Sequence, residues 1–405
     1  MAEAADPGLL TLRPPEPPGP LAWIRKNLLN TWYNALLTIL SFVVLYIVLS
    51  AILRWAFFQA DWRPVTRNPL LYLVGSYPRA QLWRVGLSLQ LVSLLLGIST
   101  GLQRGSIRYL AVAVGLILGA SSLLPLTGEL DSLTARGFLL VNPLLIALGY
   151  VLASRLAISG RLLSIGWLAS LVLIPILLRG FSQSESVPTV ETTAWGGLLV
   201  TLFLAVGGIL LSFPIGVLLA LGRRSTLPVV KLFSTAFIEI VRGVPLVTIL
   251  FMSSIILALF LPQGFRIDRL IRALLGMTLF SAAYMAENVR GGLQTIPKGQ
   301  IDAAKAVGLS NFQTTLLIVL PQALRAVIPT IVGQLISLFK DTTLAIIVAI
   351  NELLSIGKAV LQSDIEFLQL QLEVFVFIAA VFWIFSAVMS YSSRRLEERL
   401  GVGER

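Results

Sequence analysis

Long stretches without a charged residue recur along this chain, and they restrict its fold more than any other feature. Eight of them hold 17 to 31 residues each, such as the 27 residues between Lys26 and Arg54 and the 31 between Glu191 and Arg223. A helix needs about 20 mostly apolar residues to cross a bilayer. Two further gaps hold 14 residues each, and these become spans if flanking basic side chains reach the interface. The sequence therefore predicts an all-α integral membrane protein with about ten transmembrane helices.

The composition agrees with a membrane protein and excludes several kinds of chemistry. Only 13% of the 405 residues are charged while 56% are hydrophobic, so a water-facing surface could not cover the apolar majority. The chain has no cysteine and no histidine, which removes disulfides, iron–sulfur ligation and the usual haem and proton-relay side chains. The acidic residues are mostly scattered singly along the chain. We therefore expect no catalytic residues, no metal site, no bound cofactor and no enzymatic activity.

The basic residues predict how the chain is oriented, because lysine and arginine are enriched in cytoplasmic segments. With the N-terminus inside, the inner segments carry Arg25, Lys26, Arg104, Arg108, Arg155, Arg161, Arg223, Arg224, Arg394, Arg395 and Arg399. Two outer loops are exceptions, since they carry Arg63, Arg67, Arg79, Arg266 and Arg269. Ten spans place both termini in the cytoplasm. The net charge of +11 then reflects topology and attraction to membrane lipid, and no nucleic-acid partner is expected.

Changes in composition divide the chain into segments. Residues 1–33 open with a proline-rich stretch that predicts a disordered cytoplasmic tail. Residues 34–178 hold five predicted spans made mostly of Leu, Val, Ile, Gly and Ser. Glycines four residues apart in this part permit close helix approach, although ordinary packing explains them as well. A polar periplasmic linker is predicted at residues 179–194, and the more informative motifs follow it.

Two copies of the pattern Glu-x-x-Arg-Gly occur in the second half of the chain. One contains Glu239 and Arg242, and the other contains Glu287 and Arg290. Spacing by three residues puts the carboxylate and the guanidinium on one face of a helix, where they can pair. Charges close to the membrane are costly unless they are paired, so the two motifs are candidates for fixing helix ends or for gating. A purely structural ion pair at the inner interface is the alternative interpretation.

The stretch from Ile296 to Asp341 predicts short helices that meet at a glycine. Residues 300–307 favour a helix, and Gly308 can adopt the left-handed conformation that ends it. Ser310 can cap a second helix, and Pro321 can occupy the first turn of a third. A pair of short helices between two spans would project from the bundle as a docking site. A loop folded against its own bundle is an equally acceptable interpretation of these residues.

These motifs resemble the EAA loop of permease subunits in ATP-binding-cassette importers. The matching order is Asp302-Ala303-Ala304, three residues, Gly308, a hydrophobic helix and then Leu320-Pro321. Segments 283–300, 321–325 and 340–344 are similar to the polar amino-acid class of the histidine/polar amino-acid permease family. Segments 32–38, 76–84 and 242–252 resemble its M-type branch, the permeases of general L-amino-acid importers. Two positions depart from the pattern: Asp302 stands where the family has Glu, and Gly333 where Asn is common.

The resemblance implies a fold and a set of partners. A five-helix type I importer permease core would occupy residues 195–392, with a cytoplasmic coupling loop at 297–322, a tail at 393–405 and about five extra helices before it. The residues that would couple the core to an ATP-binding subunit dimer are Asp302, Ala303, Ala304, Gly308, Leu320 and Pro321. That dimer would hold ATP and Mg, because this chain has no Gly-x-x-x-x-Gly-Lys-Ser/Thr loop. A homologous second permease would complete the pathway, and a periplasmic substrate-binding protein would deliver an amino acid at the bacterial inner membrane.

An ion-coupled secondary transporter or channel for small polar solutes is the main alternative, and a structural membrane subunit is another. Ion coupling would need acidic residues within the membrane, and the chain offers only Glu239 and Glu287, both near an arginine. The substrate pathway is not assigned. The polar cluster Lys340-Asp341-Thr342 could contact the carboxylate and ammonium of an amino acid, although a helix-end salt bridge with a capping threonine fits the pattern better.

Overall fold

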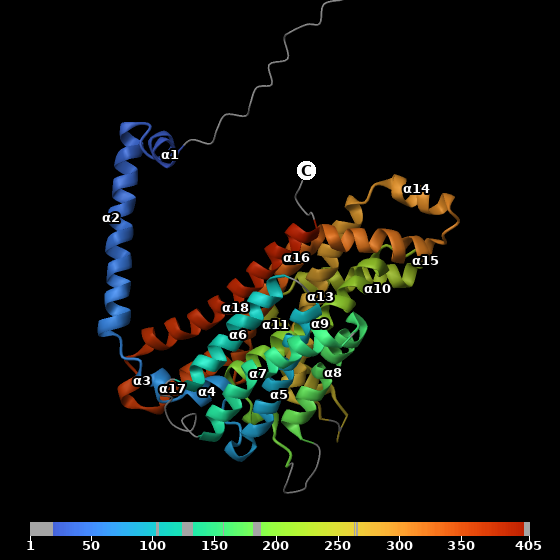
Figure 1. Ribbon diagram of the computed structural model, residues 1–405. Helices are drawn as coiled ribbons and strands as arrows, with labels where there is room; N and C mark the ends of the chain where they lie inside the picture. The colour runs from blue at the N-terminus through green and yellow to red at the C-terminus, as the bar shows by residue number, and fades with distance from the viewer. Residues whose placement is uncertain are drawn as a thin grey trace, which may run out of the picture. The chain divides into compact units, whose positions relative to one another are not determined.

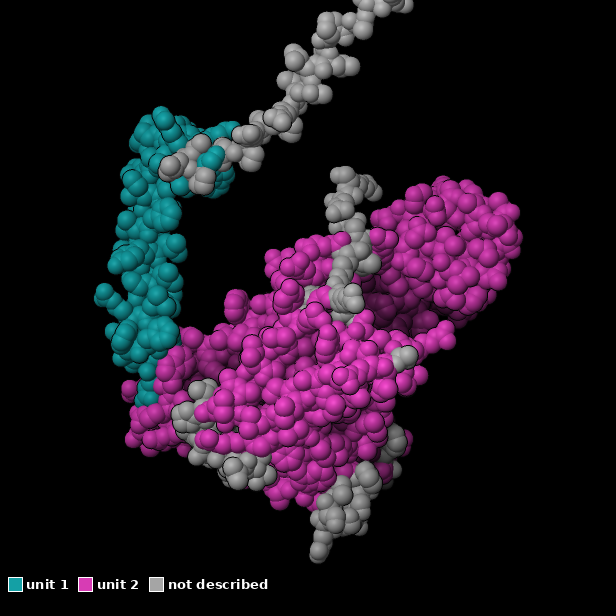
Figure 2. Space-filling model, in the orientation of Figure 1, with its two compact units in different colours: residues 1–61 teal, residues 62–405 magenta. Residues whose placement is uncertain are grey.

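The computed structural model of this protein describes residues 19–102, 105–123, 133–156, 158–180, 188–262, 264 and 266–400. Contacts within the chain divide it into two compact units, Met1–Asp61 and Trp62–Arg405 (Figure 2). The predicted tail up to residue 18, residues 181–187 of the predicted linker and residues 401–405 lie outside the described residues.

The first unit is a helical hairpin. A short helix, α1 (Pro20–Asn27), precedes α2 (Trp32–Arg54), which continues into a π-helical turn, η1 (Trp55–Gln59). The Thr38 hydroxyl donates a hydrogen bond to the Leu28 carbonyl at 3.0 Å and so ties α2 back to the preceding turn. The residues of α2 are mostly apolar, and none of them is buried within the unit. This is the pattern of a span whose sides face lipid.

The second unit is built from helices alone among the described residues (Figure 1). Its first part, which we call the N-terminal block, contains α3 (Arg63–Thr66), α4 (Pro69–Val74), α5 (Leu82–Leu102), α6 (Ser106–Leu123), α7 (Leu133–Arg155) and α8 (Gly160–Arg179). The part that follows, which we call the core, contains α9 (Gly197–Arg223), α10 (Pro228–Arg242), α11 (Leu246–Phe251), α12 (Leu257–Phe260), α13 (Arg269–Thr295), α14 (Lys298–Ala306), α15 (Asn311–Gln313), α16 (Leu320–Asp341), α17 (Leu353–Ser363) and α18 (Gln371–Leu400).

Eight helices in the described part of the chain are long and apolar enough to cross a membrane, or nine if a bent pair is counted as one span. The bent pair is α10 with α11–α12, which meet at 110° around the segment Gly243–Pro245. Pro245 is the N-cap residue of α11 and lacks the N–H that would continue α10. Helix α6 is apolar over Ile107–Leu123 but shorter than the others. Each of the ten stretches predicted to span the membrane therefore contains a helix among the described residues, and the predicted all-α membrane fold is confirmed.

Helices α9 and α13 form the centre of the core because both present small residues to each other. A Cβ atom at Gly216 of α9 would lie 2.6 Å from the Cβ of Met285 in α13. Ala282 and Ala286 on the same side of α13 are fully buried. Close approach of this kind is typical of membrane helices, where small residues replace the hydrophobic effect as the reason for association.

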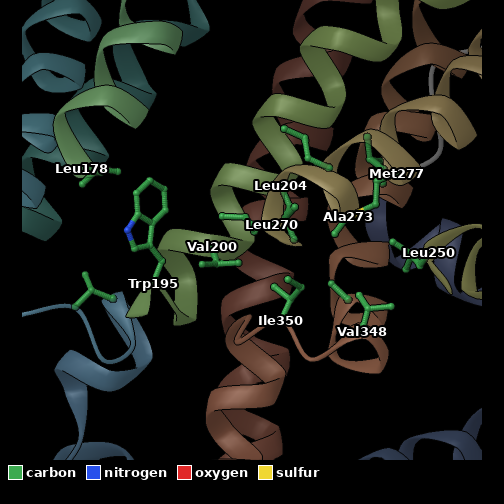
Figure 3. Close-up of a cluster of buried hydrophobic side chains, with 14 of the residues drawn as sticks. Leu178, Trp195, Val200, Leu204, Leu250, Leu270, Ala273, Met277, Val348 and Ile350 are labelled. Carbon is green, nitrogen blue, oxygen red and sulfur yellow. The ribbon is translucent and has the colours of Figure 1, made fainter. Parts of the chain in front are cut away.

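A cluster of buried apolar side chains joins α8, α9, α11 and α13 (Figure 3). It contains Leu178, Trp195, Leu204, Leu250 and Met277, together with Val348 and Ile350 from the segment before α17. The cluster fixes the start of α9 against both the N-terminal block and the core.

In the N-terminal block, α5 and α7 pack through glycine. A Cβ atom at Gly97 would overlap the carbonyl oxygen of Ile146, and one at Gly101 would lie 3.0 Å from that of Tyr150. Gly115 in α6 has only ordinary contacts, 3.6 Å or more from its neighbours. The close helix approach left open by the glycine spacing is thus present in α5 and not in α6.

Candidate functional site

Helix α16 runs between two ends of the core, and each end holds a group of polar residues. The helical segment from Asn311 to Val348 is continuous, with α14 and α15 at its start and α17 just beyond its finish (Figure 1). We call these the α14 end and the α17 end.

An ion cluster lies at the α14 end with Glu287 of α13 at its centre. Arg290, one turn further along α13, donates to both oxygens of this carboxylate, with Nε 2.9 Å from Oε2. Arg223, the last residue of α9, brings Nη1 to 3.4 Å from Oε2. Arg242, the last residue of α10, brings Nη1 to 3.7 Å from the same oxygen. One carboxylate of α13 therefore links the last residues of α9 and α10.

The second acidic residue of the cluster pairs differently from the prediction. Glu239 bonds to Arg223, with Oε1 2.8 Å from Nη2, and among the described ion pairs it does not meet Arg242. Arg242 lies instead over the ring of Tyr284, 5.5 Å from its centroid. The two Glu-x-x-Arg-Gly motifs thus come together in one cluster, but only the second forms its own internal pair. Arg223 was not predicted as a site residue. Its position at the end of a long apolar stretch was visible in the sequence, but its proximity to the second motif was not.

The cluster is only partly shielded from solvent, and its charges do not cancel. The side chain of Glu287 is 24% exposed and that of Glu239 is 55% exposed. Three guanidinium groups face two carboxylates, so the cluster carries one excess positive charge. Removal of either carboxylate would leave too few negative charges to offset Arg223, Arg242 and Arg290, which would then repel one another.

The loop after the cluster has the local structure that the sequence predicts. Helix α14 ends before Gly308, which is left-handed with φ of 85°. Ser310 and Gln313 form a capping box: the backbone N–H of Gln313 donates to Ser310 Oγ, and the backbone N–H of Ser310 donates to Gln313 Oε1. The third helix begins at Leu320 with Pro321 in its first turn, as predicted, but it is not separate from the second. A π-helical stretch, η6 (Thr314–Val319), joins α15 to α16 without a break, and Pro321 lies inside the joined helix.

The loop both packs against the core and projects from it. Leu320 is buried in a cluster with residues of α13 and α16, Ile301 of α14 packs against that cluster, and Ala304 of α14 is also buried. The other predicted coupling residues, Asp302, Ala303, Gly308 and Pro321, are exposed. Two apolar side chains that the sequence analysis did not select are also exposed, Val307 at 80% and Phe312 at 74%. The loop therefore combines the two interpretations, since one face holds it in place and the other is free.

Helix α16 carries a stripe of exposed residues that are small or polar. They recur every three or four positions and therefore share one face: Gln322, Ala326, Thr330, Gly333, Ser337 and Lys340. A Cβ atom at Gly333 would meet nothing within 4 Å. Polar side chains within a membrane span are costly against lipid, so this face needs a partner other than hydrocarbon.

The three residues named as pathway candidates lie at the α17 end of this helix. Lys340 is exposed, and Asp341 accepts a hydrogen bond from Ser337 Oγ at 3.5 Å. Thr342 is fully buried, and its hydroxyl donates to the Phe339 carbonyl at 2.7 Å. The described ion pairs do not include one between Lys340 and Asp341, so the helix-end salt bridge favoured by the sequence is not formed. Of the three, Lys340 alone presents an exposed charged group.

A buried carboxylate caps α17 at the other end of the core. Glu352 is fully buried and accepts hydrogen bonds from the backbone N–H groups of Leu354 and Ser355, both at 2.7 Å. Burial raises the pKa of Glu352 from its ordinary value of 4.5 to about 7, against the lowering effect of the two N–H groups and of Lys358. In the described ranges, no group of three acidic residues lies close enough together to hold a metal ion.

The raised pKa predicts a pH dependence of stability. The folded chain holds a proton on Glu352 that the unfolded chain releases above about pH 4.5, so stability is highest at low pH and falls as the pH rises to 7. The full loss is about 3 kcal/mol. The Glu352→Gln variant should unfold at a temperature that changes much less between pH 5 and 8 than that of the wild type. The chain has no histidine to obscure the comparison, and equal pH slopes in the two proteins would contradict the assignment.

Comparison with known proteins identifies the family. Residues 212–402 match the model of the family described as binding-protein-dependent transport system inner membrane component. The inner membrane amino-acid ABC transporter permease protein YhdY of Escherichia coli (strain K12) is 38% identical over 400 residues, covering 95% of this chain and 94% of that protein. The glutamate/glutamine/aspartate/asparagine transport system permease protein BztC of Rhodobacter capsulatus is 34% identical over 414 residues, covering 94% of each.

The chain therefore belongs to the family of binding-protein-dependent transport system inner membrane components. These two relatives match over nearly the whole of this chain and are both named as permease proteins, so the family predicted from the motifs is confirmed. A shorter relative, the probable glutamine ABC transporter permease protein GlnP of Bacillus subtilis (strain 168), is 36% identical over 206 residues, covering 51% of this chain and 92% of that protein. About half of this chain thus corresponds to nearly all of a shorter permease.

Proposed function

We propose that this chain is the membrane-spanning permease subunit of an ATP-driven amino-acid uptake system and that it couples to a separate ATPase through α14 and the turn that follows. The observation that carries the proposal is the knob formed by α14 and α15, whose outer face is exposed while its inner face is packed into the core. The names of the two full-length relatives support the class of substrate.

The free face of the knob has the composition of a docking surface. Val307 and Phe312 are large apolar side chains exposed on a segment that projects beyond the spans, where exposed apolar groups are unfavourable in water. Large apolar side chains that become buried when a partner binds carry most of the energy of protein interfaces. Asp302 adds an exposed charge to the same loop. The partner would be a dimer of ATP-binding subunits that holds ATP and Mg, since this chain has no phosphate-binding loop.

The exposed stripe of α16 supports a second permease as the other membrane partner. A homologous subunit facing this stripe would cover its polar groups and leave a path between the two chains. Lys340 is positioned at the α17 end of that path, where its ammonium group would meet the carboxylate of an amino acid. A periplasmic substrate-binding protein would deliver the amino acid at the α17 end, and both termini of the chain would lie in the cytoplasm of a bacterium.

The ion cluster around Glu287 would act as the gate at the α14 end. It joins α9, α10 and α13 through side chains that are partly exposed, so the links can exchange with water when the helices move. Helix α13, which carries Glu287 and Arg290, leads directly into α14, so the cluster and the docking surface share one connected segment. Movement of α14 would therefore change the distances on which these ion pairs depend.

Uptake by the purified complex in liposomes tests the proposal against its main alternative. The expected result is amino-acid uptake that requires ATP, the ATPase subunits and the substrate-binding protein. Uptake that instead follows an imposed ion gradient, without ATP, would support a secondary transporter. A further control is the permease alone, which should move no amino acid under either condition.

A further inference from the structure

The N-terminal block is an addition to a core that other members of the family have by itself. The family model begins at residue 212, and nearly all of the shorter Bacillus subtilis relative is matched by about half of this chain. The block nevertheless contacts the core closely, and α3 and α4 do so at the α17 end, where they touch α18, α9 and α17. The place of contact indicates what the additional helices do.

Three backbone segments meet at this end with almost no side chains between them. The N–H of Gly196 donates to the Val74 carbonyl at 3.0 Å, and the N–H of Gly197 donates to the Asn351 carbonyl at 2.8 Å. A Cβ atom at Gly75 would lie 2.5 Å from the Cα of Gly196. The start of α9 is therefore held on one side by the block and on the other by the residues before α17.

Gly197 is the tightest point of this junction. Its φ of 59° is left-handed, and a Cβ atom there would overlap the Tyr72 carbonyl oxygen and lie 2.7 Å from that of Leu71. One turn later, the Thr201 hydroxyl accepts a hydrogen bond from the N–H of Leu353 at 3.1 Å. The contact with α4 thus explains why a residue without a side chain stands at the beginning of α9.

Side chains extend the junction into a shared hydrophobic core. Tyr72 of α4 is buried with Leu353 of α17 and Val374 of α18, and its ring meets that of Phe377 edge to face at 5.1 Å. At the surface, Arg63 of α3 and Glu366 form an ion pair at 2.9 Å. Closely packed interiors move as one piece, so α4, the first turn of α9, α17 and the start of α18 form one rigid unit.

The segment that leads from α16 into this unit is, by contrast, strained. It consists of a seven-residue 3-10 helix, η7 (Thr342–Val348), followed by Ala349, which is left-handed with φ of 57°. Long 3-10 helices and left-handed residues other than glycine are uncommon, and each costs free energy. Ala349 lies between the helix that carries the polar stripe and the rigid unit that holds α17.

We propose that the N-terminal block is a brace: through α3 and α4 it fixes α17 and the first turn of α9, so that movement of α16 at the α17 end is taken up at η7 and Ala349. Its effect on uptake rests on the transport function proposed above, whereas the rigidity of the junction can be measured without transport. Gly197 and Tyr72 are positioning residues in this arrangement and do not contact substrate.

Hydrogen exchange in the full complex tests the brace through the Gly197→Ala variant. The added methyl group must push α4 away from α9, so the amides of Leu354 and Ser355 in α17 should exchange at least about tenfold faster than in the wild type. Gly264→Ala is the matched control, because Gly264 also has a left-handed φ, 92°, but a Cβ atom there would meet nothing within 4 Å. The control should leave α17 protected, and it separates backbone strain from loss of the junction.

A second pair of variants covers the case in which Gly197→Ala does not fold. Tyr72→Ala removes the ring that packs on Phe377 and introduces no backbone clash, whereas Tyr72→Phe removes only a hydroxyl that makes no hydrogen bond in the described structure. The first should speed exchange in α17 and lower the amount of amino acid taken up per ATP hydrolysed, and the second should do neither.

The outcomes for the brace and for transport are distinguishable. Unchanged exchange in α17 in the Tyr72→Ala variant would overturn the brace, and so would faster exchange with uptake per ATP equal to that of the wild type. Failure of the wild-type complex to take up any amino acid with ATP would instead overturn the transport proposal, while the exchange measurement would still report on the junction.

Discussion

Replacing Gly308 with proline, or Asp302 with lysine, is expected to abolish amino-acid uptake while the chain still inserts into the membrane. Proline fixes φ near −65°, whereas Gly308 has φ of 85°, and its N–H donates to the Lys305 carbonyl at 2.9 Å. The turn between α14 and α15 could not form, and the docking surface would be lost. We expect a fall in uptake of about 100-fold or more, which corresponds to about 3 kcal/mol of docking free energy.

The lysine variant tests the same surface without disturbing the turn. Asp302 is exposed, so reversal of its charge should leave the fold intact and act only on the partner. Gly299→Ala is a suitable control on the same helix, because a Cβ atom there would meet nothing within 4 Å. Uptake in proteoliposomes, co-purification of the ATPase and the amount of permease in membranes should be measured together. Transport at the wild-type rate in either Gly308→Pro or Asp302→Lys would contradict the docking role.

Removal of the carboxylate of Glu287 should have the second-largest effect. The Glu287→Gln variant leaves Arg223, Arg242 and Arg290 without their shared partner, and Glu239 reaches only the first of these. The three arginines then repel one another where the ends of α9 and α10 meet α13. We expect a loss of about 2 kcal/mol of stability, less than for a fully buried pair because the group is 24% exposed, together with a strong fall in uptake.

Comparison with Glu239 makes this prediction specific. Glu239→Gln removes a carboxylate that is 55% exposed and has one arginine partner, so its cost should stay below about 1 kcal/mol. In the Glu287→Gln background, a second change of Arg242→Gln should restore part of the lost stability because it removes one of the repelling charges. Thermal unfolding and uptake should be measured for the wild type, Glu287→Gln, Glu239→Gln and the double variant Glu287→Gln/Arg242→Gln. Equal effects of the two single variants would show that Glu287 is not the centre of the cluster.

The spans and the local structure of the α14 loop could be predicted because neither depends on contacts that are distant in sequence. A charge-free stretch of about 20 residues has few alternatives to a membrane helix. The turn at Gly308 and the helix cap at Ser310 each depend only on residues within three or four positions in the sequence. Pro321 occupies the first turn of α16, as predicted, but the π-helical stretch that joins this helix to α15 without a break was not predicted.

The arrangement of the ion cluster could not be read in the same way. Spacing by three residues predicted a Glu239–Arg242 pair, but the preferred partner of Glu239 is Arg223, which comes from a different helix. The 110° bend between α10 and α11 and the packing of α9 against α13 decide which guanidinium is nearest. The junction at Gly197 is hidden from the sequence for the same reason, since only the approach of α4 makes a side chain there impossible.

The unbroken helix from Asn311 to Asp341, which precedes η7, has a mechanical consequence. It makes a rod about 47 Å long at 1.5 Å per residue, about one and a half times the roughly 30 Å thickness of the hydrocarbon layer it would cross. A rod held by the bilayer near its middle behaves as a lever. A sideways push on Phe312 at one tip would swing the other tip by a comparable distance in the opposite direction, so nucleotide-driven work done on one side of the membrane would arrive on the other as displacement.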